Sequence, residues 1–189
     1  MLHHLFSPTT FWTEYPLPSL VLDHEKYAEL QESNWTYWNY CTWPRTTCHV
    51  VDGLLWVAKT LDPSLAGKAA ILLDKYTRMH FPNGDVLRPN IAKRYVPHTA
   101  EPIFDNLDYN HSPWIDIIIQ PAADITPQKT GEILIDPVDM GWECFSLTNV
   151  RYRNHDIDIN YHREQGFVVC VDGVVRATIP QLQRVIIKP

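Results

Sequence analysis

Two long segments, residues 7–43 and 82–111, contain side chains that could bind or transform a small molecule. Both are rich in aromatic residues and proline, and loops of this length are uncommon in compact proteins unless they build a site. Aromatic faces beside hydrogen-bonding side chains suit a ring with an apolar face and a polar rim, such as a pyranose. The aromatic candidates in the first loop are Trp12, Tyr15, Trp35, Trp38 and Trp43, of which Trp12, Trp35 and Trp43 are favoured.

The polar candidates lie in the second loop, and each has a structural alternative. Glu101 can be a solvated loop carboxylate with no ligand. Asp108 can cap the turn before the next helix, which is a common role for aspartate. His111 can donate to a sugar hydroxyl or satisfy the loop backbone. These alternatives stay open when the residues are considered one by one.

Metal-ligand spacing is absent from the sequence. Among the histidines outside the loops, His3, His4, His155 and His162 lack convergent spacing with carboxylates. None of the four cysteines, Cys41, Cys48, Cys144 and Cys170, forms a Cys-x-x-Cys pair with histidines nearby. We therefore predict no metal and no cofactor, and we interpret the cysteines as free, mostly buried thiols.

The composition of the chain disfavours two classes of partner, nucleic acids and membranes. The 189 residues carry a formal net charge of −6, which disfavours nucleic acid and anionic membranes. With 45% apolar and 12% aromatic residues the chain can bury a core. The apolar runs are much shorter than the roughly 20 residues of a membrane span. The N-terminal residues lack the basic start of a secretory signal. We expect a cytoplasmic protein by default, or a chain that does not begin at its natural start.

Helical spacing predicts the elements that position the loops. Apolar residues recur at helical intervals over 44–61 and 65–79, with Asp62-Pro63 between the two helices and Asn83-Gly84 after the second. So short a link makes them an antiparallel αα-hairpin. Ser112-Pro113 begins a third, short helix, with Pro121 near its end.

Near residue 126 the spacing of apolar residues changes from a helical period to a period of two, which predicts a second structural part of the chain. Alternating runs over 132–135, 144–147, 156–161, 167–171 and 185–187 are typical of strands, and Asp172-Gly173 is typical of a two-residue hairpin turn. We predict an α+β chain with a helical domain over 1–125 and a small antiparallel β-sandwich over 126–189.

Three segments in order resemble the six-hairpin (α/α toroid) glycosidases, the clan of trehalase, processing α-glucosidase I and mannosylglycerate hydrolase. The similarity is strongest to mannosylglycerate-hydrolase-like members with a C-terminal β-domain. The segments are Phe11-Trp12-Thr13-Glu14-Tyr15-Pro16-Leu17-Pro18-Ser19, then Asn34-Trp35 through Trp43-Pro44, then Tyr95-Val96-Pro97-His98-Thr99-Ala100-Glu101 followed by Tyr109-Asn110-His111-Ser112.

The resemblance implies that the chain is the C-terminal portion of such a toroid. Twelve helices of about 12 residues with loops of about 5 need roughly 200 residues before any β-domain. Only about 125 residues precede the β-part here. A partial ring leaves apolar helix faces that need the remaining barrel helices, or self-association, to cover them.

The resemblance also implies the reaction and its site. Inverting hydrolysis needs a carboxylic acid and a carboxylate about 6.5 to 9.5 Å apart. In these enzymes the acid is an aspartate from the middle of the barrel, which this chain lacks. The base is a glutamate two residues before the tyrosine of the Tyr-x-Pro loop, where this chain has Lys93. A lysine needs a large fall in pKa to act as a base at neutral pH. Glu101 matches the glutamate of the Thr-Gly-Glu motif, although Ala100 replaces the glycine, and could be recruited.

Three functional hypotheses from different classes follow. The first is a fragment of an inverting glycoside hydrolase for α-linked sugars, with catalytic positions Glu101 and Lys93. The implied sugar-binding residues are Trp12, Tyr15, Trp35, Trp43, Tyr95, Asp108 and His111. The second is a non-catalytic carbohydrate-binding or structural remnant of such an enzyme. A third hypothesis makes the β-domain a docking module that binds through an exposed strand edge.

Overall fold

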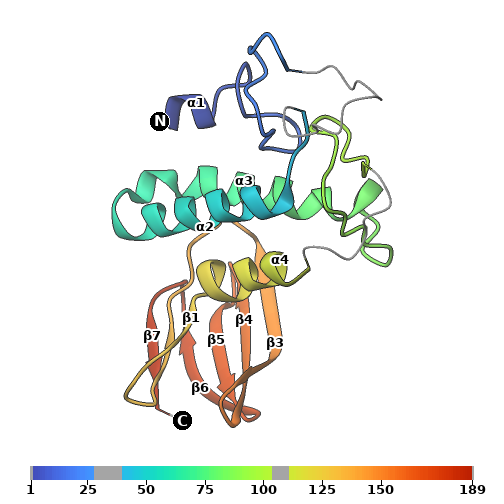
Figure 1. Ribbon diagram of the computed structural model, residues 1–189. Helices are drawn as coiled ribbons and strands as arrows, with labels where there is room; N and C mark the ends of the chain where they lie inside the picture. The colour runs from blue at the N-terminus through green and yellow to red at the C-terminus, as the bar shows by residue number, and fades with distance from the viewer. Residues whose placement is uncertain (1, 28–39, 104–110, 189) are drawn as a thin grey trace. The chain divides into compact units, whose positions relative to one another are not determined.

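The computed structural model describes residues 2–27, 40–103 and 111–188 (Figure 1). Its contacts divide the chain into two units, one of residues 1–53 and 71–115, the other of residues 54–70 and 116–189. The divisions at 53/54, 70/71 and 115/116 fall inside helices, so each unit contains part of every helix that is divided. The boundary at 125/126 rests on the sequence pattern and stays a prediction.

The helices of the N-terminal part agree with the predicted spacing. The short α1 (Leu2–Leu5) precedes the first long loop, and α2 (Pro44–Thr60) begins at a proline, which suits the first helical turn. The one-turn helix η2 (Pro63–Leu65) follows, and the Asp62 carboxylate caps it by accepting from the Ser64 N–H at 3.1 Å. Then α3 (Ala66–Met79) lies beside α2, as the αα-hairpin prediction requires (Figure 1).

Short elements lie on each side of the second long loop. The turn η3 (Pro82–Gly84) comes directly after α3. The loop leads to α4 (His111–Ile117), which continues as the π-helical segment η4 (Ile118–Ala122). The short helix predicted from Ser112-Pro113 is therefore present, and its last turn is wider than an α-helical one.

The remaining residues form two antiparallel sheets. One has the order β1-β2-β7 and comprises β1 (Ile125–Pro127), β2 (Ile133–Ile135) and β7 (Val185–Ile187). The other has the order β3-β4-β5-β6 and comprises β3 (Cys144–Tyr152), β4 (His155–His162), β5 (Gly166–Val171) and β6 (Val174–Ile179). The predicted α+β class with an antiparallel β-part is confirmed.

The two sheets bury their apolar residues in one core. Alternate residues along each strand point into it, as the period of two requires. The buried members are Ile125, Ile133, Ile135 and Ile187 from the first sheet, and Tyr152, Ile157, Ile159, Phe167, Val169 and Val171 from the second.

A cluster of charges joins the end of α2 to the strands of the same unit. The Lys59 ammonium contacts Asp124 and lies 3.0 Å from the Asp136 carboxylate. Arg184 donates two hydrogen bonds to the same oxygen of Asp136, at 2.9 and 2.7 Å. Partial burial opposes ionisation of Asp136, but the hydrogen bonds from Arg184 and Lys59 outweigh it and lower its pKa.

Two further expectations from the sequence concern the thiols and the membrane. The four cysteines are free thiols, with Cys41 and Cys48 buried, Cys170 half-buried and Cys144 exposed. Among the helices of the described ranges, none combines the length and the apolar character needed to cross a membrane.

Candidate functional site

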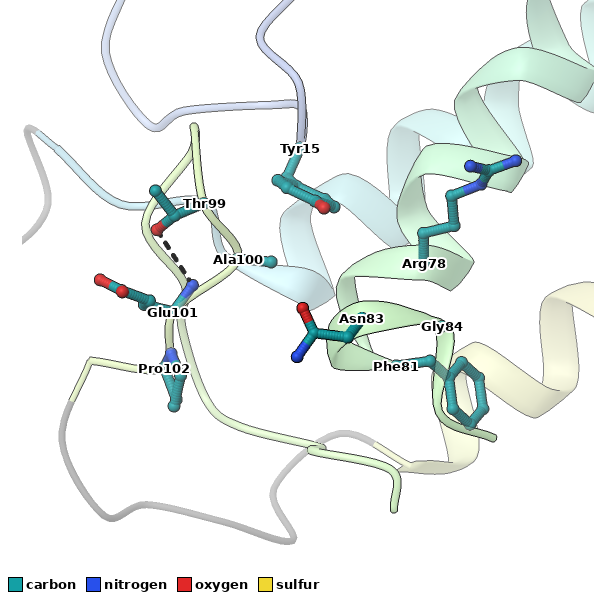
Figure 2. A pocket seen from close by; sticks show the side chains of 9 residues that line it. All are labelled: Tyr15, Arg78, Phe81, Asn83, Gly84, Thr99, Ala100, Glu101 and Pro102. Carbon is teal, nitrogen blue, oxygen red and sulfur yellow. Dashed lines mark hydrogen bonds between the residues drawn. The ribbon is translucent and has the colours of Figure 1, made fainter. Parts of the chain in front are cut away.

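The two long loops meet around a cavity of about 620 Å³ in the first unit (Figure 2). One side comes from Tyr15 of the first loop and residues 99–102 of the second loop, and the other from the end of α3 and the turn that begins the second loop. The lining residues are Tyr15, Arg78, Phe81, Asn83, Gly84, Thr99, Ala100, Glu101 and Pro102. Its volume is in the range of small-molecule sites, and it combines two aromatic rings with amide, hydroxyl and carboxylate groups.

A ladder of backbone hydrogen bonds holds the loops together. Thr42 and Tyr95 exchange two backbone hydrogen bonds, both of 3.0 Å, and Tyr95 in turn pairs with Pro102. The Tyr15 N–H donates to the Pro97 carbonyl at 2.9 Å, while the Thr42 hydroxyl donates to the Tyr15 carbonyl at 2.7 Å. These contacts bring segments far apart in the sequence to one place, and they set the positions of Tyr15 and Glu101 at the cavity.

Tyr95 lies behind the cavity. Its side chain is fully buried, and its hydroxyl accepts from the Ala92 N–H at 2.7 Å while donating to the Asn90 carbonyl. Burial raises the pKa of this hydroxyl above its ordinary value, so it stays protonated. In this structure Tyr95 holds the second loop and does not face the cavity.

Glu101 lies at the rim of the cavity and is exposed. Its backbone N–H donates to the Thr99 hydroxyl at 3.3 Å, and its carboxylate points away from Tyr15 and Asn83 (Figure 2). The preceding Ala100 has a φ of 58°, in the left-handed region that favours glycine. The backbone at this position therefore gives a physical reason for the glycine of the Thr-Gly-Glu motif.

Lys93, at the position of the base in the resembled enzymes, packs beside Trp43. The Lys93 ammonium is 6.0 Å from the centre of a Trp43 ring, and the Arg94 guanidinium is 5.5 Å from a Trp43 ring. Cations over an indole are favourable contacts. Neither Lys93 nor Trp43 belongs to the residues that line the cavity.

Trp12 packs within the first loop. Its ring meets Phe6 edge to face at 5.1 Å, and the Lys75 ammonium is 6.0 Å from its centre. Lys75 also pairs with the Glu14 carboxylate at 3.1 Å. Trp12 is not a lining residue of the cavity.

The structure does not test the remaining predicted site residues. Trp35 and Asp108 lie outside the described residues. His111 begins α4, but its side chain is not described. The sugar-binding and catalytic assignments of all these residues stay predictions.

The sequence pattern does not predict four of the lining residues: Arg78, Phe81, Asn83 and Gly84. Arg78 and Phe81 lie at the end of α3 and just after it, and Asn83 and Gly84 lie in the turn at the start of the second loop, where the sequence pattern marks only a helix end and names no site residue. Arg78 pairs with Asp74 at 2.8 Å and its guanidinium points away from the other lining residues (Figure 2). Their place at the site follows from the loop ladder, for which the sequence carries no local signal.

A buried histidine lies behind this site. The His80 ring is packed among Tyr76, Tyr95 and Trp114, with ring centres 4.9, 5.7 and 5.7 Å away. Nδ1 lies 2.8 Å from the Tyr76 carbonyl, which can only accept, so Nδ1 carries the proton of the neutral ring. Nε2 is buried and has no hydrogen-bond partner among the described residues. Burial lowers the pKa of His80 to about 4.

We expect His80 to make the fold sensitive to acid. The unfolded chain binds this proton near pH 6.5 and the folded chain only near pH 4, so stability falls as the pH drops through that window. At pH 5 the loss is on the order of 2 kcal/mol. Denaturant unfolding at pH 7 and pH 5 checks this, with His80→Phe as the variant that keeps an aromatic ring but cannot titrate. Equal losses between the two pH values in both proteins would contradict it.

Metal-ligand clusters are missing from the described side chains. Within residues 2–27, 40–103 and 111–188, no group of three or more histidine, cysteine, aspartate or glutamate residues could hold an ion.

Comparisons with known proteins agree with the glycosidase resemblance. The family model of the mannosylglycerate hydrolase MGH1-like glycoside hydrolase domain matches residues 1–112. The fold is similar to a solved structure named sialidase, with a TM-score of 0.76 and 19% identity, over 98% of this chain and 18% of that chain. At this identity the likeness concerns the fold alone. The chain spans less than a fifth of that solved protein.

No curated protein matches the sequence. The family match is the stronger finding because it covers more than half of the chain and includes both loops that meet at the cavity. The chain therefore belongs to the mannosylglycerate hydrolase MGH1-like glycoside hydrolases, a glycosidase-related family.

Proposed function

We propose that this chain supplies one wall of the sugar site of an inverting glycoside hydrolase that acts on α-linked sugars. The observation that supports it is the cavity itself, which is lined by Tyr15 from the first loop, Glu101 from the second loop and Phe81 from the end of α3, all within the family domain. Aromatic faces and a carboxylate are the groups that a glycosidase needs to hold a pyranose and act on its bond.

Inverting hydrolysis also needs a second carboxyl group, and this requirement extends the proposal. Inversion needs two carboxyl groups about 6.5 to 9.5 Å apart, one protonated and one ionised. Glu101 is the one carboxylate among the described lining residues. Lys93, at the base position, is a cation beside Trp43. The proposed role of Glu101 is that of the base, recruited in place of the family glutamate, which requires its carboxylate to turn from the direction seen in Figure 2 toward the sugar. The acid is proposed to come from barrel helices, as in the resembled enzymes.

The partner in this proposal is the rest of a six-hairpin toroid. In the described ranges, α2, α3 and the short α4 are too few for a ring of twelve helices, and the chain covers only 18% of the similar solved structure. Large apolar side chains are exposed on these helices, among them Trp56, Ile71 and Ile115. Further barrel helices, or a second copy of the chain, would remove such surface from water.

The test uses the polypeptide encoded by the whole reading frame, assayed with aryl and natural α-glycosides. We expect Glu101→Gln to lower kcat by about 100-fold because a general base contributes at least this much. Lys93→Glu should raise kcat, since it restores the base that relatives carry. Glu25→Gln is the matched control, because Glu25 is an exposed carboxylate that does not line the cavity.

The products of the reaction decide the stereochemistry, since inversion gives a product of opposite anomeric configuration that proton NMR detects directly. Retention would overturn the inverting mechanism. Activity that is unchanged in both Glu101→Gln and Lys93→Glu would overturn the site assignment.

A second function has its own supporting observation. Lys93 at the base position, packed with Trp43, favours a carbohydrate-binding remnant without turnover. That function predicts sugar binding by calorimetry and no hydrolysis at any pH. Gain of turnover in Lys93→Glu would count against a strictly structural remnant.

A further inference from the structure

We propose that Asn83 binds a hydroxyl pair of the sugar and selects among pyranoses by the configuration of those hydroxyls. The inference rests on the proposed sugar site and adds to it a specificity residue outside the resembled motifs. It is carried by the backbone conformation of Asn83, by the direction of its amide and by the unused hydrogen-bonding groups around it.

The turn after α3 presents Asn83 to the cavity. Asn83 has φ 58° and ψ 17°, and Gly84 follows with φ 72°, so two consecutive residues are left-handed. The Gly84 N–H closes the turn on the Phe81 carbonyl at 2.9 Å. Asparagine and glycine are the residues that adopt this conformation most readily. Glycine would therefore satisfy the backbone at position 83, and the turn alone does not require an amide side chain.

The amide is directed at the opposite wall. Figure 2 shows the Asn83 side chain pointing across the cavity toward the loop of Ala100 and Glu101, between that loop and α3. The Tyr15 ring lies on the same side of the loop, with its hydroxyl near the middle of the lining residues (Figure 2).

The hydrogen-bonding capacity of this amide is unused by the protein. Among the described residues, neither the Asn83 amide nor the Tyr15 hydroxyl has a hydrogen-bond partner. A carboxamide offers two donors and an acceptor on one plane, so it can accept from one hydroxyl and donate to the next. Two neighbouring hydroxyls of a pyranose have this spacing only in certain configurations. The ligand class is therefore a neutral hexopyranose with a vicinal hydroxyl pair.

A glycine substitution at position 83 tests the contribution of the amide side chain without changing the backbone conformation of the turn. Asn83→Gly keeps the left-handed turn and removes only the side chain, so the fold should be retained. The matched control is Asn149→Gly, because Asn149 is also exposed with a φ of 57° but lies in β3 of the other unit. A second variant, Asn83→Asp, keeps an acceptor and loses the donors.

The experiment uses the polypeptide encoded by the whole reading frame and measures by calorimetry its binding of methyl α-glucoside, α-mannoside and α-galactoside, together with monodeoxy analogues of the tightest binder. We expect Asn83→Gly to weaken the tightest binder about tenfold, in line with a lost pair of hydrogen bonds, and to narrow the differences among the three sugars. One deoxy analogue should bind wild type and Asn83→Gly equally. Asn83→Asp should weaken binding as well, and Asn149→Gly should not.

The experiment distinguishes failure of the proposed function from failure of the role of Asn83 alone. A wild-type protein that binds none of these sugars overturns the proposed function and this inference with it. A wild-type protein that binds them, with unchanged affinity and selectivity in Asn83→Gly, overturns the role of Asn83 alone.

Discussion

Replacing Gly166 by alanine will destabilise the second unit by about 3 kcal/mol. Gly166 begins β5 with a φ of +94°, where a residue with a Cβ pays about 1–2 kcal/mol. The new Cβ would also collide with the Ile179 carbonyl oxygen, and would lie 3.2 Å from its carbon and 3.3 Å from the Pro180 Cα. These are backbone atoms at the end of the neighbouring strand, so relief requires the β5–β6 pairing to shift.

Gly173→Ala is the matched control for this prediction. Gly173 also has a positive φ, +74°, but a methyl group added there would meet none of the described atoms within 4 Å. We expect it to cost about 1 kcal/mol, the backbone penalty without the collision. The free energy of unfolding in urea, followed by circular dichroism, measures both variants. Equal losses of stability in Gly166→Ala and Gly173→Ala would show that the short distance from Ile179 is not the reason for a glycine at position 166.

The same hairpins show what a single sequence can predict of the β-part. Asp172 and Gly173 both have positive φ, and Val171 pairs with Val174, as the two-residue turn prediction requires. The alternating pattern nevertheless does not predict β6 after that turn, because no residue of this edge strand is fully buried and the adjacent Val174 and Val175 are both exposed. Without a fully buried face, an edge strand lacks the alternation that marks its neighbours.

The pattern predicts too short a β3 for a different reason. The pairing register shifts between Leu147 and Val150, and Asn149 there is left-handed. Such a bulge inserts residues that break the period of two, so the pattern ends at 147 although the strand continues to Tyr152.

The candidate site is predictable from the sequence as two loops but not as a cavity. Aromatic and proline content identifies both segments, and the family motifs identify Tyr15 and Glu101 within them. The contribution of Asn83 depends on the direction in which α3 ends, which is a property of tertiary packing. Thr42, Tyr95 and Pro102 pair through their backbones, so side-chain patterns carry no signal for that ladder.

The second large effect is expected for Tyr95→Phe, which should lower the free energy of unfolding by about 3 kcal/mol. The ring is fully buried, so the change leaves packing intact and removes only the hydroxyl. The buried Ala92 N–H then loses its acceptor, and the carbonyl of half-buried Asn90 loses its donor. Each unsatisfied buried group costs about 1–3 kcal/mol. Because the Tyr95 backbone pairs with both Thr42 and Pro102, the loss should also loosen the loop that carries Glu101.

Tyr152→Phe is the control that separates the two expected consequences of Tyr95→Phe, the loss of stability and the loss of sugar affinity. The Tyr152 hydroxyl also bridges two backbone groups, accepting from the Gln128 N–H at 3.1 Å and donating to the Glu132 carbonyl at 3.3 Å, but in the other unit. Urea unfolding should therefore show a loss of stability in both variants, while methyl α-glycoside affinity should fall several-fold in Tyr95→Phe alone. Unchanged sugar affinity in a destabilised Tyr95→Phe would mean that the ladder supports the fold without positioning the cavity wall. Unchanged stability would instead require a relaxed loop in which Ala92 and Asn90 find other partners.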